Sequence, residues 1–293
     1  MNKKPFNSLN DYFVRYFFTD KGGEKVLLDF INAVMISANM KTFKAVEILN
    51  PFNLKRNYKD KETIVDVKCI TKNGTIVIIE VQLSGNSRFP ERILYYWSTN
   101  YSKLLKKGEG YEDLTPVISI NLLNFNLNKK DSNVHSCYMI YDTKNKRLLT
   151  DHLQIHIIEL KKFNFKNNNL SKDLNYWLGF FTTKNMEEYM SEIVKEKPIM
   201  EEAHKRYNNF IRSRLMMSEY EKKEIYQYDK QIMLKDERRE GIKEGMKKGK
   251  LEGLKEGRIA GQISMATAMK KDGADINLIS KYTGLTIDEI KKL

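Results

Sequence analysis

The feature that most constrains this chain is the stretch 60–83, which reads DKETIVDVKCITKNGTIVIIEVQL. Two runs rich in Val, Ile and Thr flank Asn73-Gly74, a pattern that predicts two β-strands joined by a turn. Asp66 interrupts the first run and Glu80 interrupts the second. The chain is therefore expected to build a sheet around this hairpin, with an acid in each strand.

The alternation of side chains constrains how the two strands pair. The odd-numbered positions of both runs are mostly apolar, and alternate residues of a strand share a face. Facing residues must lie on the same face, so odd positions pair with odd positions. A two-residue turn at Asn73-Gly74 would place Asp66 opposite Val81, which mixes the faces.

A three-residue loop that ends at a left-handed Gly74 solves this problem. It pairs Thr71 with Thr75. Asp66 then lies directly opposite Glu80, with the two Cβ atoms roughly 5 Å apart. Two carboxylates at such a short distance repel each other, and this repulsion raises the pKa of at least one of them unless a cation neutralises the pair. Mg²⁺ is held in this way by one or two carboxylates. A solvated strand face with scattered polar residues is the alternative reading.

The composition favours a polyanionic partner and a reducing compartment. The net charge is +13 over 293 residues, as is typical of proteins that bind nucleic acid, although a basic surface with no such partner would look the same. Cys69 and Cys137 are too few for a disulfide framework. With no long apolar run and no signal-peptide pattern, we expect a cytoplasmic protein without a membrane partner.

Hydrophobic periodicity predicts the element order α-α-β-β-β-α-β-β-β up to about residue 165. The run 114–125, LTPVISINLLNF, is apolar almost throughout, as expected of a central strand covered on both faces. A charged helical composition follows. We predict three parts: a domain over 1–165, a helical region over 166–240 with a break near Ser218, and a tail over 241–293.

The tail begins with a row of glycines at every fourth position. They are Gly241, Gly245, Gly249, Gly253, Gly257 and Gly261. Each interior glycine costs a helix about 1 kcal/mol relative to alanine. A helix with this row could pack closely against a second one, which predicts a homo-oligomer; a flexible charged linker is the alternative.

The last residues, 263–293, predict three short helices. Asp275 is a candidate cap, Gly284 a stop, and Thr286 with Glu289 a capping box. The spacing is similar to that of a helix-turn-helix, although a small helical tail or oligomer cap fits the same pattern.

The sequence gives little support for a histidine metal site, nucleophilic catalysis or nucleotide binding. His152 and His156 have the i, i+4 spacing of a helical metal site, but their segment reads as a strand, where that spacing spans roughly 13 Å. No nucleophile elbow, P-loop or dinucleotide fingerprint is present.

Asp66, Glu80 and Gln82 remain, and here the sequence resembles a known family. IVDVKC, the hairpin and IIEVQL are similar to the Asp…Glu-x-Lys signature of PD-(D/E)XK nucleases, with Gln82 at the lysine position. The segments NDYFVRYFF, FPERILYYWS and GEGYEDLTPVISINLLNF, with the glycine row, resemble the Rpn family of recombination-promoting nucleases and transposase-like proteins within that superfamily.

The resemblance implies an α/β, restriction-endonuclease-like core with a mixed sheet flanked by helices, followed by a helical C-terminal region. It implies Mg²⁺-dependent DNA cleavage, with Mn²⁺ as a substitute ion. Asp66 and Glu80 would hold the metal, and Gln82 would take the third catalytic position without the usual charge. The alternative is a weak or inactive DNA-binding scaffold that keeps the nuclease fold.

The same resemblance suggests further site residues. Asp11 in the first helix is a candidate additional acid, with Glu24 as its competitor. Arg92 and Tyr96, on the helix after the hairpin, are candidates for contact with DNA phosphate. A salt bridge and helix packing would explain these two residues equally well.

Overall fold

The computed structural model describes residues 6–50, 52, 66–85 and 88–293. The predicted strand residues 60–65 lie outside this range. The chain divides into two compact units, Met1–Glu224 and Ile225–Leu293. This division differs from the predicted limits at 165 and 240, because helices between 172 and 212 share one core with the sheet. No helix in the described part of the chain combines the length and apolarity needed to cross a membrane.

The first unit contains one mixed sheet, in the order β1-β2-β3-β4-β6-β5. Within the described residues its strands are β1 (Val46–Ile48), β2 (Val67–Thr71), β3 (Ile76–Gln82), β4 (Val117–Leu123), β5 (His135–Tyr141) and β6 (Leu148–Glu159). The β3–β4 and β4–β6 pairs are parallel and the others antiparallel. All seven residues of β4 are buried, which confirms the predicted central strand.

The β2–β3 hairpin has the predicted register. Val67 pairs with Ile79. The loop closes with a hydrogen bond from the Thr71 N–H to the Thr75 carbonyl at 2.9 Å. Gly74 has a φ of +86°, a left-handed conformation that glycine adopts without steric cost. The three-residue loop is therefore confirmed, and with it the pairing of odd positions with odd positions.

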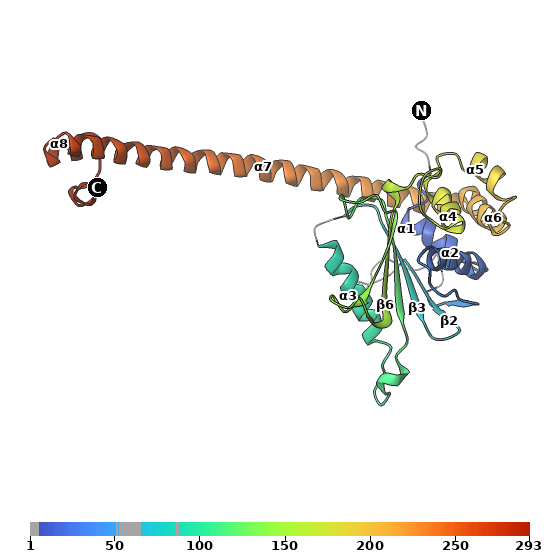
Figure 1. Ribbon diagram of the computed structural model, residues 1–293. Coiled ribbons are helices and arrows are strands. Elements are labelled where there is room, and N and C mark those ends of the chain that lie inside the picture. The colour runs from blue at the N-terminus through green and yellow to red at the C-terminus, as the bar shows by residue number, and fades with distance from the viewer. Residues whose placement is uncertain (1–5, 51, 53–65, 86–87) are drawn as a thin grey trace. The chain divides into compact units, whose positions relative to one another are not determined.

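Helices cover both faces of the sheet (Figure 1). On one face lie α1 (Asp11–Thr19), α2 (Glu24–Ser37), α4 (Lys172–Thr182), α5 (Met186–Ile193) and α6 (Ile199–Arg212). Their core is aromatic and includes the fully buried Phe13, Phe17, Phe30, Trp177 and Phe180. On the other face α3 (Phe89–Ser102) buries Phe89 and Ile93 against Leu123 and Ile157. Two short 3₁₀ turns, Tyr111–Asp113 and Leu160–Lys162, complete the elements of this unit.

The first helix is fixed at both ends. Asn10 caps its start by accepting hydrogen bonds from the backbone N–H groups of Tyr12 and Phe13. At its other end the guanidinium of Arg206, from α6, is buried and donates to the carbonyls of Phe17 at 2.7 Å and Asp20 at 3.1 Å. A cation at a helix C-terminus satisfies carbonyls that have no partner inside the helix. The Asn10 cap and the Arg206 contacts together hold the helix that carries Asp11.

The helix α7 (Arg214–Lys271) follows a break at Ser213, rather than near Ser218 as predicted. In the second unit, α8 (Ile276–Thr283) and α9 (Ile287–Lys292) follow it. The caps are as predicted: Asp275 caps α8, Gly284 ends it with a φ of +73°, and Thr286 forms the capping box of α9. These short helices bury Ile279 and Ile290 against Ala266.

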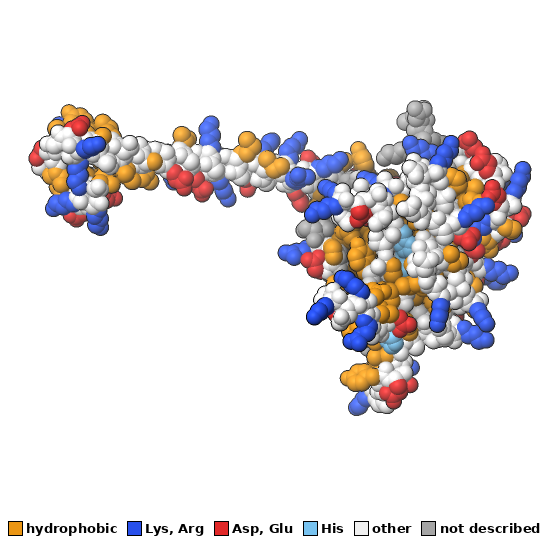
Figure 2. All heavy atoms as spheres, in the orientation of Figure 1, with side chains coloured by type: hydrophobic (Ala, Val, Ile, Leu, Met, Phe, Trp, Pro, Cys, Tyr) orange, Lys and Arg blue, Asp and Glu red, His pale blue; other side chains and the backbone are white. Residues whose placement is uncertain are grey.

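The glycine row lies within α7. A Cβ added at any of its six glycines would meet nothing within 4 Å, so packing inside the described chain does not explain them. Charged and apolar side chains alternate along this helix (Figure 2). The exposed apolar residues here include Ile242, Met246, Leu251, Leu254 and Ile259.

Candidate active site

Asp66 directly precedes β2 and Glu80 lies near the end of β3, so both are at the open end of the β2–β3 hairpin. Since Val67 pairs with Ile79, the register places Asp66 opposite Glu80. The Asp66 carboxylate accepts a hydrogen bond from the backbone N–H of Val81 at 2.7 Å. This contact ties the first acid to the strand that carries the second.

The two acids share a site that penalises their charges. Glu80 is only 8% exposed. Burial, and then the charge of Asp66, hold the pKa of Glu80 well above its usual value. Burial also raises the pKa of Asp66 to about 7, against the opposing effect of its hydrogen bond from Val81. A buried and a half-buried carboxylate, both with raised pKa values, form a site that a cation would stabilise.

Gln82 lies between an acid and a cation. Its Oε1 accepts a hydrogen bond from Nη2 of Arg92 at 2.5 Å, and its Nε2 donates to Oε2 of Glu80 at 3.4 Å. The Arg92 guanidinium also lies over the Phe89 ring, 5.1 Å from its centroid. The positive charge of Arg92 lowers the pKa of Glu80, against the effect of burial.

Asp11 lies near the other acid. Its charge raises the pKa of Asp66, and the charges of Lys223 and Arg15 lower it. Asp11 Oδ2 and Lys223 Nζ are 3.1 Å apart. The competing acid, Glu24, is exposed in the first turn of α2.

Tyr96 lies one helical turn after Arg92 on α3, where i and i+4 side chains share a face. It is half-buried. The helix therefore presents Arg92 and Tyr96 on the same side, and the contacts described above place Arg92 next to Gln82.

Sequence reasoning missed two cations, Arg15 and Lys223. Arg15 follows Asp11 by four residues on one helix, a spacing that does bring side chains together. Its buried Nε and Nη2 find no hydrogen-bond partner among the described residues, which is costly for a charged group. Lys223 comes from α7, 212 residues after Asp11. No local pattern reports such a contact.

The acids of the candidate site form a donor set suited to a hard cation. Mg²⁺ takes oxygen ligands and commonly binds to one or two carboxylates plus waters and substrate phosphate. Asp66 and Glu80 could supply those carboxylates. Among the described residues, no three His, Cys, Asp or Glu side chains come together closely enough to hold a metal ion. The fit is thus to an ion with two protein carboxylates, rather than to a closed cage such as a structural zinc site.

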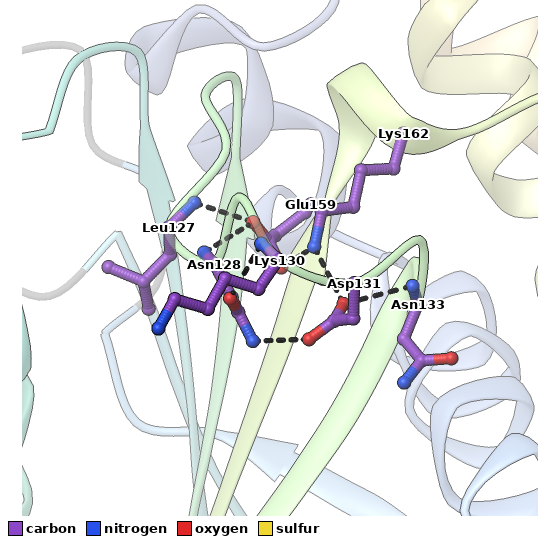
Figure 3. Close-up of polar contacts among 7 residues, drawn as sticks. All are labelled: Leu127, Asn128, Lys130, Asp131, Asn133, Glu159 and Lys162. Carbon is purple, nitrogen blue, oxygen red and sulfur yellow. Dashed lines mark hydrogen bonds and ion pairs between the residues drawn. The ribbon is translucent and has the colours of Figure 1, made fainter.

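Glu159 is a second buried acid, and a cation and two backbone N–H groups contact its carboxylate (Figure 3). Its Oε1 accepts hydrogen bonds from the backbone N–H groups of Leu127 at 2.5 Å and Asn128 at 3.1 Å. Its Oε2 lies 2.7 Å from Nζ of Lys162, which also contacts Asp131 at 3.0 Å. Glu159 therefore fastens a loop to the end of β6. Among the described residues, no Lys or Arg forms a comparably close ion pair with Asp66 or Glu80.

The histidines form no metal-binding group with the Cys, Asp and Glu residues that the structure describes. His152 and His156 lie on β6, as predicted. His156 is fully buried, and its Nδ1 is 3.0 Å from Nε2 of His135. Burial lowers the pKa of both His135 and His156, to about 4 and about 3, so this pair is neutral at pH 7.

Comparison with known proteins agrees with the fold. Residues 8–237 match the family model described as PD-(D/E)XK nuclease family transposase. Searches of curated proteins and of solved structures give no match. The matched region includes the whole sheet and the helices on both of its faces, so the predicted α/β fold with its C-terminal helical region is confirmed. The chain belongs to the family of PD-(D/E)XK nuclease transposases.

Proposed function

We propose that this protein is a Mg²⁺-dependent DNA endonuclease, associated with recombination or transposition, in which Asp66 and Glu80 hold the metal. One observation carries the proposal: two acids on paired strands lie opposite each other in a setting that raises the pKa of both. Membership of a nuclease transposase family supports the choice of DNA as substrate. The net charge of +13 is consistent with a polyanion.

Each residue has a distinct part in the proposed reaction. Mg²⁺, or Mn²⁺ in its place, would supply Lewis-acid polarisation of the scissile phosphate and a more acidic bound water. Asp66 and Glu80 bind the ion in their ionised forms, so ion binding and proton release are linked. Asp11 and Lys223 set the charge around Asp66. Arg92 and Tyr96 face the DNA backbone.

Nicking of supercoiled plasmid tests this proposal. We expect cleavage with Mg²⁺ or Mn²⁺, and none with EDTA. Asp66→Asn and Glu80→Gln should each reduce the rate by at least about 100-fold, the scale on which removal of a strong electrostatic contribution acts. Glu24→Gln is the matched control, because Glu24 is exposed on α2. Full activity in Asp66→Asn would exclude the proposed metal site.

The alternative is a DNA-binding scaffold that keeps the nuclease fold without its activity. Gln82 favours it, because this residue brings no charge to the position where the signature has lysine. Such a protein would bind duplex DNA with a steep salt dependence but would not nick it with either metal. Binding measured beside nicking separates the two functions.

We also propose that α7 joins two copies of the chain through its glycine row. The six glycines find no partner within the described chain, and their lack of side chains would let a second helix approach closely. Gly249→Gln with Gly253→Gln should convert an oligomer to a monomer in light scattering. Lys247→Gln with Lys250→Gln is the control. A monomeric wild type would support the charged linker instead.

The proposed setting is the cytoplasm. Within the described residues both cysteines are free thiols, and burial raises the pKa of Cys69 to about 12 and of Cys137 to about 11. Two cysteines that remain free thiols suit a reducing compartment.

A further inference from the structure

The side chain at position 82 makes two contacts that a lysine could not make together. Gln82 accepts from the Arg92 guanidinium through Oε1 and donates towards Glu80 through Nε2. An amide has both an acceptor and a donor end, whereas an ammonium group only donates. A lysine at 82 would place a second positive charge against Arg92. The glutamine and the arginine therefore fit each other as a pair.

The pair places the guanidinium beside the acidic site. Arg92 is half-buried on α3, and the Gln82 amide that it contacts also contacts the Glu80 carboxylate. Its guanidinium is steadied on one side by the Phe89 ring and on another by Gln82. A cation held by two contacts loses less conformational entropy when it meets a ligand.

The charge of Arg92 is still available to a ligand. Within the described part of the chain no carboxylate lies within ion-pair distance of it. Lys223, by contrast, is a cation near the acids whose charge is already paired, with Asp11 at 3.1 Å. A guanidinium has five N–H donors, and their planar fork matches two oxygens of a phosphate.

We propose, on the basis of the proposed nuclease function, that Arg92 is the catalytic cation of this site and that Gln82 positions it. Arg92 binds the scissile phosphate and stabilises the charge that grows on it during cleavage. The family signature has a lysine on β3; in this protein the corresponding positive charge comes from Arg92 on α3. The glutamine is a matched part of this arrangement rather than a loss of function.

An exchange of the two positions tests the proposal by plasmid nicking. Arg92→Ala should lower the rate at least about 100-fold, and Arg92→Lys should restore part of it. Gln82→Lys alone should also be slow, because two cations then compete for one place. Gln82→Lys combined with Arg92→Ala should be at least about tenfold faster than Arg92→Ala, since the charge returns to β3. Arg88→Ala, an exposed position paired with Glu91, is the control.

A second measurement needs no cleavage. In Ca²⁺, binding of a labelled duplex is followed by fluorescence anisotropy at several salt concentrations. Loss of a phosphate contact in Arg92→Ala should reduce the slope of log K against log salt by about one, while Gln82→Ala reduces it less. Thermal melting within a few degrees of the wild type shows that the variants are folded.

The outcomes separate the two claims. A wild-type rate in Arg92→Ala, or a double variant no faster than Arg92→Ala, overturns the role of Arg92 while the nuclease proposal stands. A wild type that never nicks DNA overturns the nuclease proposal. In that event the salt slope still decides whether Arg92 contacts phosphate, and an unchanged slope in Arg92→Ala rejects it.

Discussion

Asp66 lies opposite Glu80, one position beyond the last pair of the β2–β3 ladder, and the Asp66 carboxylate is hydrogen-bonded to the N–H of Val81, the residue after Glu80. The hydrogen bond favours the charged form of Asp66, but burial outweighs it, so the pKa is raised to about 7. The fold thus holds two acids together at a cost to its own stability. Active sites often show such a conflict between stability and function.

Asp66→Asn should stabilise the metal-free protein near pH 7. A carboxyl group whose pKa is higher in the folded state makes its full contribution to the free energy of unfolding below its unfolded pKa of about 4. This contribution is lost as the pH rises towards 7. The gain from Asp66→Asn should therefore grow from pH 4.5 to 7.5. A shift of three units corresponds to at most about 4 kcal/mol.

Urea unfolding in EDTA at several pH values measures this gain. The difference between variant and wild type is the quantity to follow, because His135 and His156 act in the opposite direction. Their lowered pKa values remove stability as pH falls below about 6.5 in both proteins. A difference that does not change with pH would contradict the prediction.

Asp11 and Lys223 should tune metal binding in opposite directions. Asp11→Asn removes a charge that raises the pKa of Asp66, and Lys223→Met removes one that lowers it. The pH at which Mn²⁺ binding reaches half its maximum should fall in the first variant and rise in the second, each by about one unit or less. Calorimetric titration with Mn²⁺ from pH 5.5 to 8 follows both shifts. Glu24→Gln should leave the midpoint in place, and shifts of equal sign would contradict the assignment.

Gly74→Ala should destabilise the hairpin through two effects. Its φ is +86°, which costs an L-residue about 1–2 kcal/mol. A Cβ there would also lie 2.9 Å from Cγ2 of Thr115. Gly108→Ala is the matched control, because its φ is +96° and nothing lies within 4 Å of the added atom.

Chemical denaturation should rank the loss as greater for Gly74→Ala than for Gly108→Ala. Thr115→Ser removes the clashing methyl and keeps the hydroxyl that donates to the Gly74 carbonyl at 2.7 Å. Combined with Gly74→Ala, it should recover the part of the loss that comes from the clash. If the double variant recovers no stability, the whole loss comes from the left-handed backbone conformation at position 74.

Glu159→Gln should lower the free energy of unfolding by about 3 kcal/mol. The change leaves the ammonium of Lys162, whose side chain is only 6% exposed, without its buried partner. Asp131→Asn removes the more exposed partner of Lys162 and should cost less than about 1 kcal/mol. Thermal and urea unfolding of both variants check this order. Equal losses would mean that the two acids contribute alike.

The hairpin could be predicted because its information is local. The alternation of apolar and polar side chains shows which residues share a face of the hairpin. Pairing residues of the same face requires a three-residue loop, and Gly74 can adopt the left-handed conformation that this loop needs. The central strand and the caps of α8 and α9 were predictable for the same reason. Each depends on residues only a few positions apart.

The rest of the site depends on contacts that no local pattern contains. The partner of Gln82 lies on the next helix, and its identity depends on how α3 crosses the sheet. Lys223 reaches Asp11 from 212 residues away. The break at Ser213 could not be located from the sequence, because no glycine or proline marks it.

The contacts between α1 and α7 have a consequence for the order of synthesis. Asn7 donates to the Tyr220 hydroxyl at 2.7 Å, Asn10 to Glu224 at 2.8 Å, and Asp11 pairs with Lys223. On the ribosome these partners emerge more than 200 residues after the segment around α1. The two acids of the hairpin can therefore meet well before Lys223 reaches Asp11. The electrostatic setting of Asp66 is completed only when the start of α7 has left the ribosome.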